Sequence, residues 1–188
     1  MRLFLLSGLV FHKVIWEVMK RRDAALPAGT IKAKTRLLSA IKLAVLAGIF
    51  AQVLGWEILP ISNGGPAVKY LRPMGLAIYT IGLLTAITAR TQLGQNWSDI
   101  EKSFVKDDHA LVAHGLYRYI RHPIYTGDLL LLFGLELALQ SWAVAGVAAV
   151  AIYVRQQAVR EERNLRQTLP GYTQYCRITG RFVPFLRV

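Results

Sequence analysis

The sequence predicts an all-α fold, an integral membrane helical bundle with five transmembrane helices. Of the 188 residues, 54% are hydrophobic and only 18% are charged, whereas about a quarter of the residues of an average soluble domain are charged. Four apolar runs, and a fifth that is more polar, come near the roughly 20 residues that a helix needs to cross a bilayer. Lys and Arg are concentrated in alternate connections between these runs, as a bundle of successive spans requires.

The five expected spans cover residues 3–19, 37–59, 71–89, 124–139 and 142–160. The first is the most polar, with His12, Lys13 and Glu17 in its second half. Because no A-x-A-like cleavage site follows its apolar first half, we interpret it as a retained helix rather than a signal peptide. The last two spans come from one apolar stretch that is too long for a single helix. Polar residues at Gln140-Ser141 interrupt it, which predicts a helical hairpin with a tight turn.

Basic residues are distributed unevenly between the two sides of this bundle. Eighteen Lys and Arg lie in segments 20–36, 90–122 and 155–188, and the opposite side has three. The positive-inside rule then predicts a protein of an inner or plasma membrane. Its amino terminus lies outside and its carboxyl terminus lies on the cytoplasmic side. Basic loops beside anionic lipids account for the formal charge of +12. So apolar a chain is a poor nucleic-acid-binding module, and we expect no nucleic-acid partner.

Residues 1–188 are expected to form one membrane domain. Residues 1–90 contain the first three helices, and residues 91–188 contain a long polar loop, the hairpin and a tail. The second half of the loop is dense in Arg, His and Tyr. Pro123 suits the first turn of a helix, where its missing N–H is not needed, so this basic and aromatic cluster is expected at the cytoplasmic mouth of the fourth span.

The fourth span contains two acidic residues within the predicted membrane region. At 100° per residue, Tyr125, Asp128 and Glu136 share one helix face. A carboxyl group inside a bilayer is costly and should face the bundle interior or water. Glu136 is therefore expected either to make a hydrogen bond between helices or to line a ligand cavity.

The sequence offers no metal site. Its one cysteine, Cys176, excludes an internal disulfide, a CxxC redox pair and a multi-cysteine zinc site. Three histidines, His109, His114 and His122, are spaced so that no two share one helical face, and no acidic ligand completes a zinc pattern. We expect no bound metal.

Two sequence segments together carry a resemblance. The run His114-Gly115-Leu116-Tyr117-Arg118-Tyr119 leads into Arg121-His122-Pro123-Ile124-Tyr125-Thr126-Gly127, followed by Glu161-Glu162, Leu165, Gly171-Tyr172, Tyr175, Arg181 and Pro184. Over roughly the last hundred residues this pattern resembles the isoprenylcysteine carboxyl methyltransferases and their bacterial and archaeal relatives. The RHPxYxG run with the Glu pair is also shared by phospholipid N-methyltransferases.

This resemblance implies S-adenosyl-L-methionine as methyl donor, bound on the cytoplasmic side. The family pattern carries over, as the cofactor-binding residues, onto His114, Gly115, Tyr117, Arg121, His122, Pro123, Tyr125, Gly127, Glu161 and Glu162. Because Glu161 and Glu162 point about 100° apart on a helix, only one of them is expected to face the donor. The sequence has no G-x-G-x-x-G after a strand, which excludes a Rossmann-type methyltransferase.

The resemblance also implies a lipophilic methyl acceptor that enters from the membrane, with a carboxylate of the isoprenylcysteine type. Arg181 or Arg177 is the candidate catalytic residue that orients this carboxylate. An amine acceptor, as in a phospholipid N-methyltransferase, would need Glu161, Glu162 or His122 as a base. A transporter or assembly factor is the non-enzymatic alternative, with the acids of the fourth span as relay groups. The apolar tail residues 182–186 are expected to dock the tail on the bundle.

Overall fold

The computed structural model describes residues 1–23, 36–61, 68–94 and 110–186, with side chains from residue 43 onward in the second range, and the regular secondary structure of this part consists of helices with no strands. The helices are α1 (Arg2–Asp23), α2 (Arg36–Leu54), α3 (Val68–Leu93), α4 (Pro123–Ala138), α5 (Gly146–Thr168) and α6 (Tyr172–Ile178), with short 3-10 helices η2 (Gly115–Arg118) and η3 (Trp142–Ala145). The all-α prediction is confirmed. The turn at residues 63–65, His109 and most of segment 20–36 lie outside the described residues.

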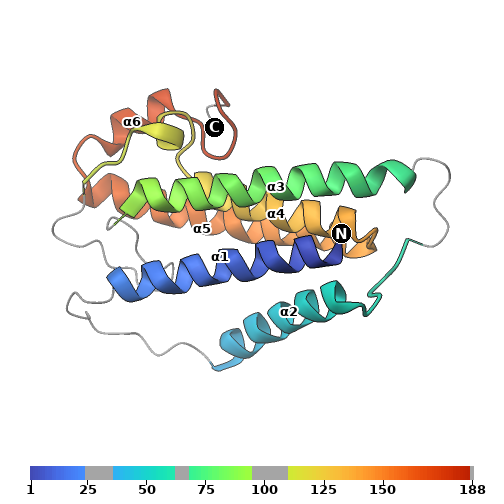
Figure 1. Ribbon diagram of the computed structural model, residues 1–188. Helices are drawn as coiled ribbons and strands as arrows, with labels where there is room; N and C mark the ends of the chain where they lie inside the picture. Colours follow the sequence, from blue (N-terminus) through green and yellow to red (C-terminus); the bar gives the residue numbers. More distant parts are fainter. Residues whose placement is uncertain (24–35, 62–67, 95–109, 187–188) are drawn as a thin grey trace.

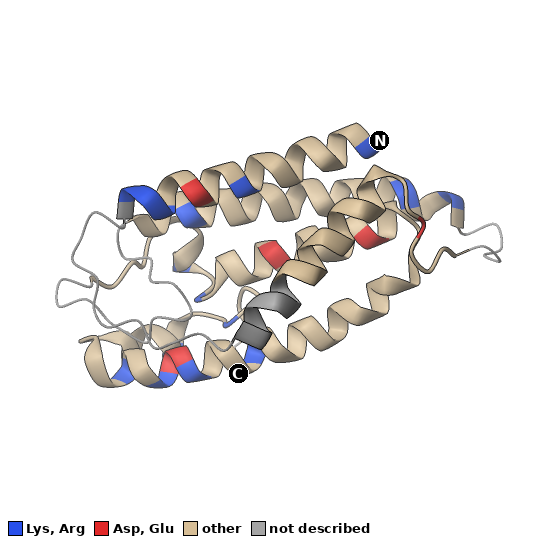
Figure 2. Ribbon diagram, turned by 90° about the horizontal axis from the view of Figure 1, so that it is seen from below, with Lys and Arg blue, Asp and Glu red and all other residues tan. Residues whose placement is uncertain are grey.

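The five long helices lie side by side and alternate in direction, while α6 and the carboxyl-terminal tail cover one end of the bundle (Figure 1). Lys and Arg gather toward the helix ends, with long uncharged stretches between them (Figure 2). Each of the five long helices overlaps one of the expected spans, and α6 lies beyond them. Among the described residues, length and composition alone qualify two helices to cross a membrane, Val68–Leu93 and Trp142–Thr168.

Helices α3 and α4 form the central pair, and glycines bring their backbones into contact. Gly75 on α3 faces Gly134 on α4, and Gly82 faces Gly127. On each helix the two glycines are seven residues apart. A Cβ atom added at Gly134 would overlap the backbone nitrogen of Tyr79. Small residues are what allow membrane helices to approach so closely. The pair therefore gives α4, which carries the site residues, a rigid support.

Polar contacts attach the first two helices to this pair. The Tyr79 hydroxyl donates to the Leu5 carbonyl over 2.8 Å, and the Gln52 amide donates to Glu136 Oε2 over 2.8 Å. Both contacts are buried beside an apolar core made of Leu5, Leu9, Val53, Tyr79, Leu131, Leu135 and Ala138. Of the two roles expected for Glu136, the structure shows the hydrogen bond between helices.

The hairpin between α4 and α5 turns where it was expected. Gln140 has a positive φ of 54°, and the Ser141 hydroxyl accepts from Ala143 N over 3.0 Å as the N-cap of η3. The Ser141 hydroxyl also donates to the Ile58 carbonyl over 2.9 Å, which attaches the turn to the segment after α2. At the other end of α4, Pro123 occupies the first turn and His122 is the N-cap, as predicted.

Candidate functional site

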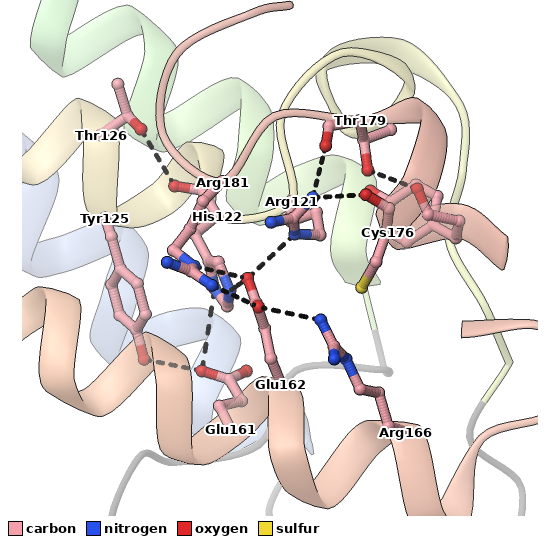
Figure 3. Close-up of polar contacts among 11 residues, drawn as sticks. Arg121, His122, Tyr125, Thr126, Glu161, Glu162, Arg166, Cys176, Thr179 and Arg181 are labelled. Carbon is pink, nitrogen blue, oxygen red and sulfur yellow. Dashed lines mark hydrogen bonds and ion pairs between the residues drawn. The ribbon is translucent and has the colours of Figure 1, made fainter. Parts of the chain in front are cut away.

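The expected site residues converge where α4 begins, α5 ends and the tail folds back. The carboxylate of Glu162, on α5, is the centre of this arrangement (Figure 3). Its Oε1 accepts from Arg121 Nε and Arg181 Nε, both over 2.9 Å, and lies 3.2 Å from His122 Nε2. Its Oε2 accepts from Arg181 Nη2 over 3.0 Å. One buried carboxylate thus holds basic groups from two other segments of the chain.

Arg121 joins this centre to the cap formed by α6. Its Nη1 donates to the Cys176 carbonyl over 3.0 Å and also to the Thr179 carbonyl. The side chain is only 2% exposed. A buried guanidinium needs such a complete set of acceptors, because leaving it unpaired would cost several kcal/mol. Arg121 is therefore a residue that builds the site, with little surface left for a ligand.

The tail is held by backbone hydrogen bonds. Arg121 N donates to the Gly180 carbonyl over 2.8 Å, and His122 N donates to the Arg181 carbonyl over 3.1 Å. The Thr126 hydroxyl donates to the Phe182 carbonyl over 3.0 Å. These contacts place the Arg181 side chain on Glu162.

The expected apolar docking of the tail is limited to two aromatic contacts, one of them the edge-on approach of Phe185 to Tyr119 with ring centroids 6.3 Å apart. Phe182 packs against His122, with ring centroids 5.9 Å apart. Val183, Phe185 and Leu186 are 53%, 81% and 58% exposed, so the prediction that they bury themselves against the bundle is wrong. Because backbone pairing already fixes the tail, these side chains remain on its outer surface.

Glu161 and Glu162 point to different surroundings, as their 100° separation predicts. The Glu161 side chain is 39% exposed, whereas that of Glu162 is 3% exposed. The Tyr125 hydroxyl donates to Glu161 Oε2 over 3.0 Å, and the Tyr125 ring stacks on His122 at 5.3 Å with an interplanar angle of 11°. Glu161 is thus the accessible carboxylate of the pair.

Buried tyrosines support the cap over this site. The Tyr175 hydroxyl donates to the Tyr117 carbonyl over 2.6 Å. Burial raises the pKa of the Tyr117, Tyr172 and Tyr175 phenols well above the ordinary tyrosine value. Hydrogen bonds to Glu162 raise the pKa of the Arg181 guanidinium, so the basic partner is charged at every physiological pH.

The remaining sequence candidates lie at the edges of the site. His114, the N-cap of η2, and Gly115, its first residue, are exposed, and Gly115 adopts a positive φ of 57° against the Gln92 side chain. Gly127 is buried on the α3 side of α4, where an added Cβ would lie 2.5 Å from Ala86 N, so it has a packing role. Arg177 is exposed on α6.

Two features of the site were not anticipated. The carbonyl oxygens of Cys176 and Thr179 complete the surroundings of Arg121, and no side-chain pattern could reveal them. Gln92 is the second: its Oε1 accepts from Leu116 N over 2.8 Å and fixes the start of η2. In the described part of the chain, no group of three His, Cys, Asp or Glu side chains is placed to hold a metal.

A model of the phospholipid methyltransferase family matches residues 71–170, which is more than half of the sequence. The chain belongs to the phospholipid methyltransferase family. The matched residues include most of α3, all of α4 and α5, and both partners of the Arg121–Glu162 contact. The glycine-packed pair and the Arg121, His122 and Glu162 part of the carboxylate centre are therefore within the family's common segment, whereas Arg181 follows it.

The chain is also similar to individual curated proteins. The chain is 34% identical over 111 residues to the cobalt-zinc-cadmium resistance protein CzcN of Cupriavidus metallidurans, covering 58% of this chain and 50% of that protein. It is 30% identical over 115 residues to protein-S-isoprenylcysteine O-methyltransferase A of Arabidopsis thaliana, covering 60% and 58%. The chain thus spans about half the length of the curated relatives it matches. The resemblance to the isoprenylcysteine carboxyl methyltransferases is confirmed.

The fold of this phospholipid methyltransferase family member also has a solved counterpart. The structure of the eukaryotic intramembrane Ras methyltransferase ICMT superposes with a TM-score of 0.68 at 20% identity, covering 97% of this chain and 66% of that one. This likeness extends beyond the family-matched segment and includes the first two helices. The bundle as a whole therefore has the fold of that enzyme.

Proposed function

We propose that this protein is an integral membrane methyltransferase that moves a methyl group from S-adenosyl-L-methionine to the carboxylate of a lipophilic acceptor of the isoprenylcysteine type. All five long helices cross an inner or plasma membrane, with the amino terminus outside and the basic loops beside anionic lipids on the cytoplasmic side. The acceptor enters from the bilayer. The observation that carries the proposal is the accessible Glu161 next to the network centred on Glu162.

The residues present fit the proposed donor. S-adenosylmethionine has an ammonium group, which the partly exposed Glu161 carboxylate can bind, and a sulfonium, which aromatic faces stabilise. Tyr125 and His122 provide stacked rings on that side of Glu161. Glu162 does not bind the donor in this proposal, because its oxygens already accept from Arg121, His122 and Arg181.

The donor supplies an electrophilic methyl group on sulfur, and the protein supplies position and charge. An acceptor carboxylate is ionised at neutral pH, so no residue of this chain has to remove a proton before the new O–CH3 bond forms and the S–CH3 bond breaks. Arg181 orients that carboxylate. Its Nε and Nη2 are held by Glu162, and among the described residues its Nη1 makes no hydrogen bond, so this nitrogen can donate to the acceptor.

Phospholipid N-methylation is the second candidate, because the family to which the chain belongs is described as phospholipid methyltransferase and a phospholipid head group can offer an amine. An amine must lose a proton, and Glu161 is the accessible group that could accept it. The two functions differ in the product, since a methyl ester is hydrolysed by alkali and an N-methyl group is not.

Donor binding tests the site and separates an enzyme from a transporter or assembly factor. We expect the protein in lipid nanodiscs to bind S-adenosylmethionine in a calorimetric titration. Glu161→Gln should weaken this binding about tenfold, because it removes a charged partner of the ammonium. Glu17→Gln is the matched control: Glu17 pairs with Arg21 on the exposed end of α1, and its loss should change nothing. Absence of binding by the unaltered protein would contradict the proposal.

A further inference from the structure

Large apolar side chains of the carboxyl-terminal tail remain exposed next to one another. Tyr119, which follows η2, is 46% exposed, and its ring meets that of Phe185 edge-on with centroids 6.3 Å apart. Val183 and Leu186, on either side of Phe185, are also more than half exposed. We call Tyr119, Val183, Phe185 and Leu186 the tail patch. Exposed apolar side chains that cluster in this way mark an interaction surface, whereas scattered ones do not.

The backbone of the tail holds these side chains in an outward direction. Leu186 N donates to the Val183 carbonyl over 3.3 Å and closes a turn. This turn lies directly on Gly180, where an added Cβ would overlap the Val183 carbonyl. Phe185 has a φ of 64°, which a bulky residue rarely adopts. Backbone strain of this kind persists only where the surroundings fix it, so the tail patch is a built feature of the fold.

A hydrogen bond to α4 defines the depth of the tail patch in the proposed membrane. The Thr126 hydroxyl donates to the Phe182 carbonyl over 3.0 Å. Thr126 lies in the first turn of α4, which is one of the proposed spans. The tail folds back from α6 along the bundle (Figure 1). Residues 183–186 therefore lie near the depth at which α4 enters the bilayer from the cytoplasmic side.

The chemistry of the tail patch and its neighbour matches a lipid interface. The guanidinium of the exposed Arg118 lies 5.9 Å from the Tyr119 ring centroid. Tyrosine is enriched at the level of lipid head groups, and arginine beside apolar side chains is attracted to anionic lipids. A soluble partner would have to reach the patch at the bilayer surface, where lipid is already present. The lipid leaflet is therefore the occupant that these observations favour.

We propose that the tail patch is a membrane anchor: Phe185 and Leu186 enter the cytoplasmic leaflet, and Arg118 binds the phosphate of an anionic lipid. The anchor keeps the tail, and Arg181 with it, at the bilayer surface where a lipophilic acceptor leaves the membrane. This inference rests on the membrane placement in the proposed function and on no step of the methyl transfer. It also explains why the apolar side chains of the tail do not pack on the bundle.

A fluorescent probe on a single cysteine tests the anchor in the full chain. Cys176→Ser removes the one native cysteine, and Phe185→Cys then takes a probe that is sensitive to its surroundings. Because Phe185 is exposed, this change should leave Tm unaltered. The protein is placed in nanodiscs whose lipids carry a nitroxide quencher on the acyl chain, close to the head group. The probe should lose most of its fluorescence there, and iodide in the water should quench it little.

Two further probe positions on α5 are matched controls. Ile152 is 61% exposed and precedes Glu162 by ten residues, so Ile152→Cys places the probe about 15 Å deeper in the proposed span. Thr168 is exposed and follows Glu162 by six residues, about 9 Å further toward the cytoplasm. The probe at Ile152 should be quenched by a nitroxide deep in the acyl chain. The probe at Thr168 should be quenched by iodide instead.

These controls separate failure of the anchor from failure of the proposed membrane placement. Iodide quenching at Phe185, together with lipid quenching at Ile152, would overturn the anchor and leave the proposed function standing. Protection of the Phe185 probe from both quenchers would also overturn it, because another protein surface would then cover the tail patch. No lipid quenching at Ile152 would contradict the membrane placement and the anchor together.

The charge of the lipid tests the assigned contact of Arg118. Nanodiscs of phosphatidylcholine alone are compared with nanodiscs that also contain phosphatidylglycerol. We expect the anionic lipid to increase lipid quenching of the Phe185 probe, and Arg118→Ala should abolish this increase. Arg163→Ala is the control, because Arg163 is exposed on α5 outside the tail patch, and it should keep the increase. The same increase in Arg118→Ala as in the control would overturn the phosphate contact.

Discussion

Glu162→Gln is the substitution that most severely challenges the proposed architecture of the site. Glu162 is 2% exposed and accepts from two guanidinium groups and a histidine. Gln keeps the shape and one acceptor oxygen, but it removes the charge and turns an N–H2 toward cationic donors. Removing one partner of a buried ion pair lowers the free energy of unfolding by about 3–5 kcal/mol, because the other partner stays buried without its counter-charge.

The expected loss of stability is large enough to measure in detergent. For a chain of this size each kcal/mol corresponds to about 2–4 °C, so we expect the Tm of Glu162→Gln to fall by about 10 °C. The neighbouring Glu161→Gln is the control, since Glu161 is partly exposed and accepts one hydrogen bond from Tyr125. Glu161→Gln should lower the free energy of unfolding by less than about 1 kcal/mol. Equal melting temperatures for the two variants would refute the argument that Glu162 organises the site.

Further substitutions and conditions test the other parts of the account. Gly134→Ala should lower the stability measured by thermal unfolding by about 1–3 kcal/mol, because the added Cβ would meet the α3 backbone. Gly48→Ala is the control and should be neutral or stabilising, because the space around Gly48 is open. Arg181→Ala should leave donor binding within about twofold but lower turnover and raise KM for a carboxylate acceptor about tenfold; full activity would reject its role. Because burial raises the pKa of the three buried phenols of the cap, the unfolded chain loses those protons first, so unfolding in detergent should become easier as the pH rises past about 10. A reporter after Val188 should be cytoplasmic and one inserted at residues 63–65 external, and finding both on one side would contradict five spans.

Much of the helical framework could be predicted because it depends on local signals. Pro123 marked the start of α4, and the polar break at Gln140-Ser141 marked the hairpin turn. The four glycines of the contact between α3 and α4 are also visible in the sequence, as Gly75 and Gly82 and as Gly127 and Gly134, the two members of each pair being seven residues apart. The spacing alone does not say which helix is the partner.

The site was predicted as a set of residues but not as an arrangement. The sequence indicated that one of Glu161 and Glu162 faces the ligand, and only the packing of α5 against α4 shows that Glu162 is the buried one. Arg181 was expected to face the acceptor, and its pairing with Glu162 depends on backbone hydrogen bonds of the tail. Such long-range pairings have no local sequence signal.

The alkaline lability of the methylated product tests the central claim most directly. The protein in nanodiscs is incubated with methyl-labelled S-adenosylmethionine and N-acetyl-S-farnesylcysteine, and the lipid-soluble product is treated with alkali. Methyl transfer to a carboxylate predicts that the label is released as volatile methanol, and that Arg181→Ala forms little labelled product. Label that withstands alkali would contradict the carboxylate acceptor and support N-methylation, and no labelled product despite donor binding would contradict the proposed acceptor class.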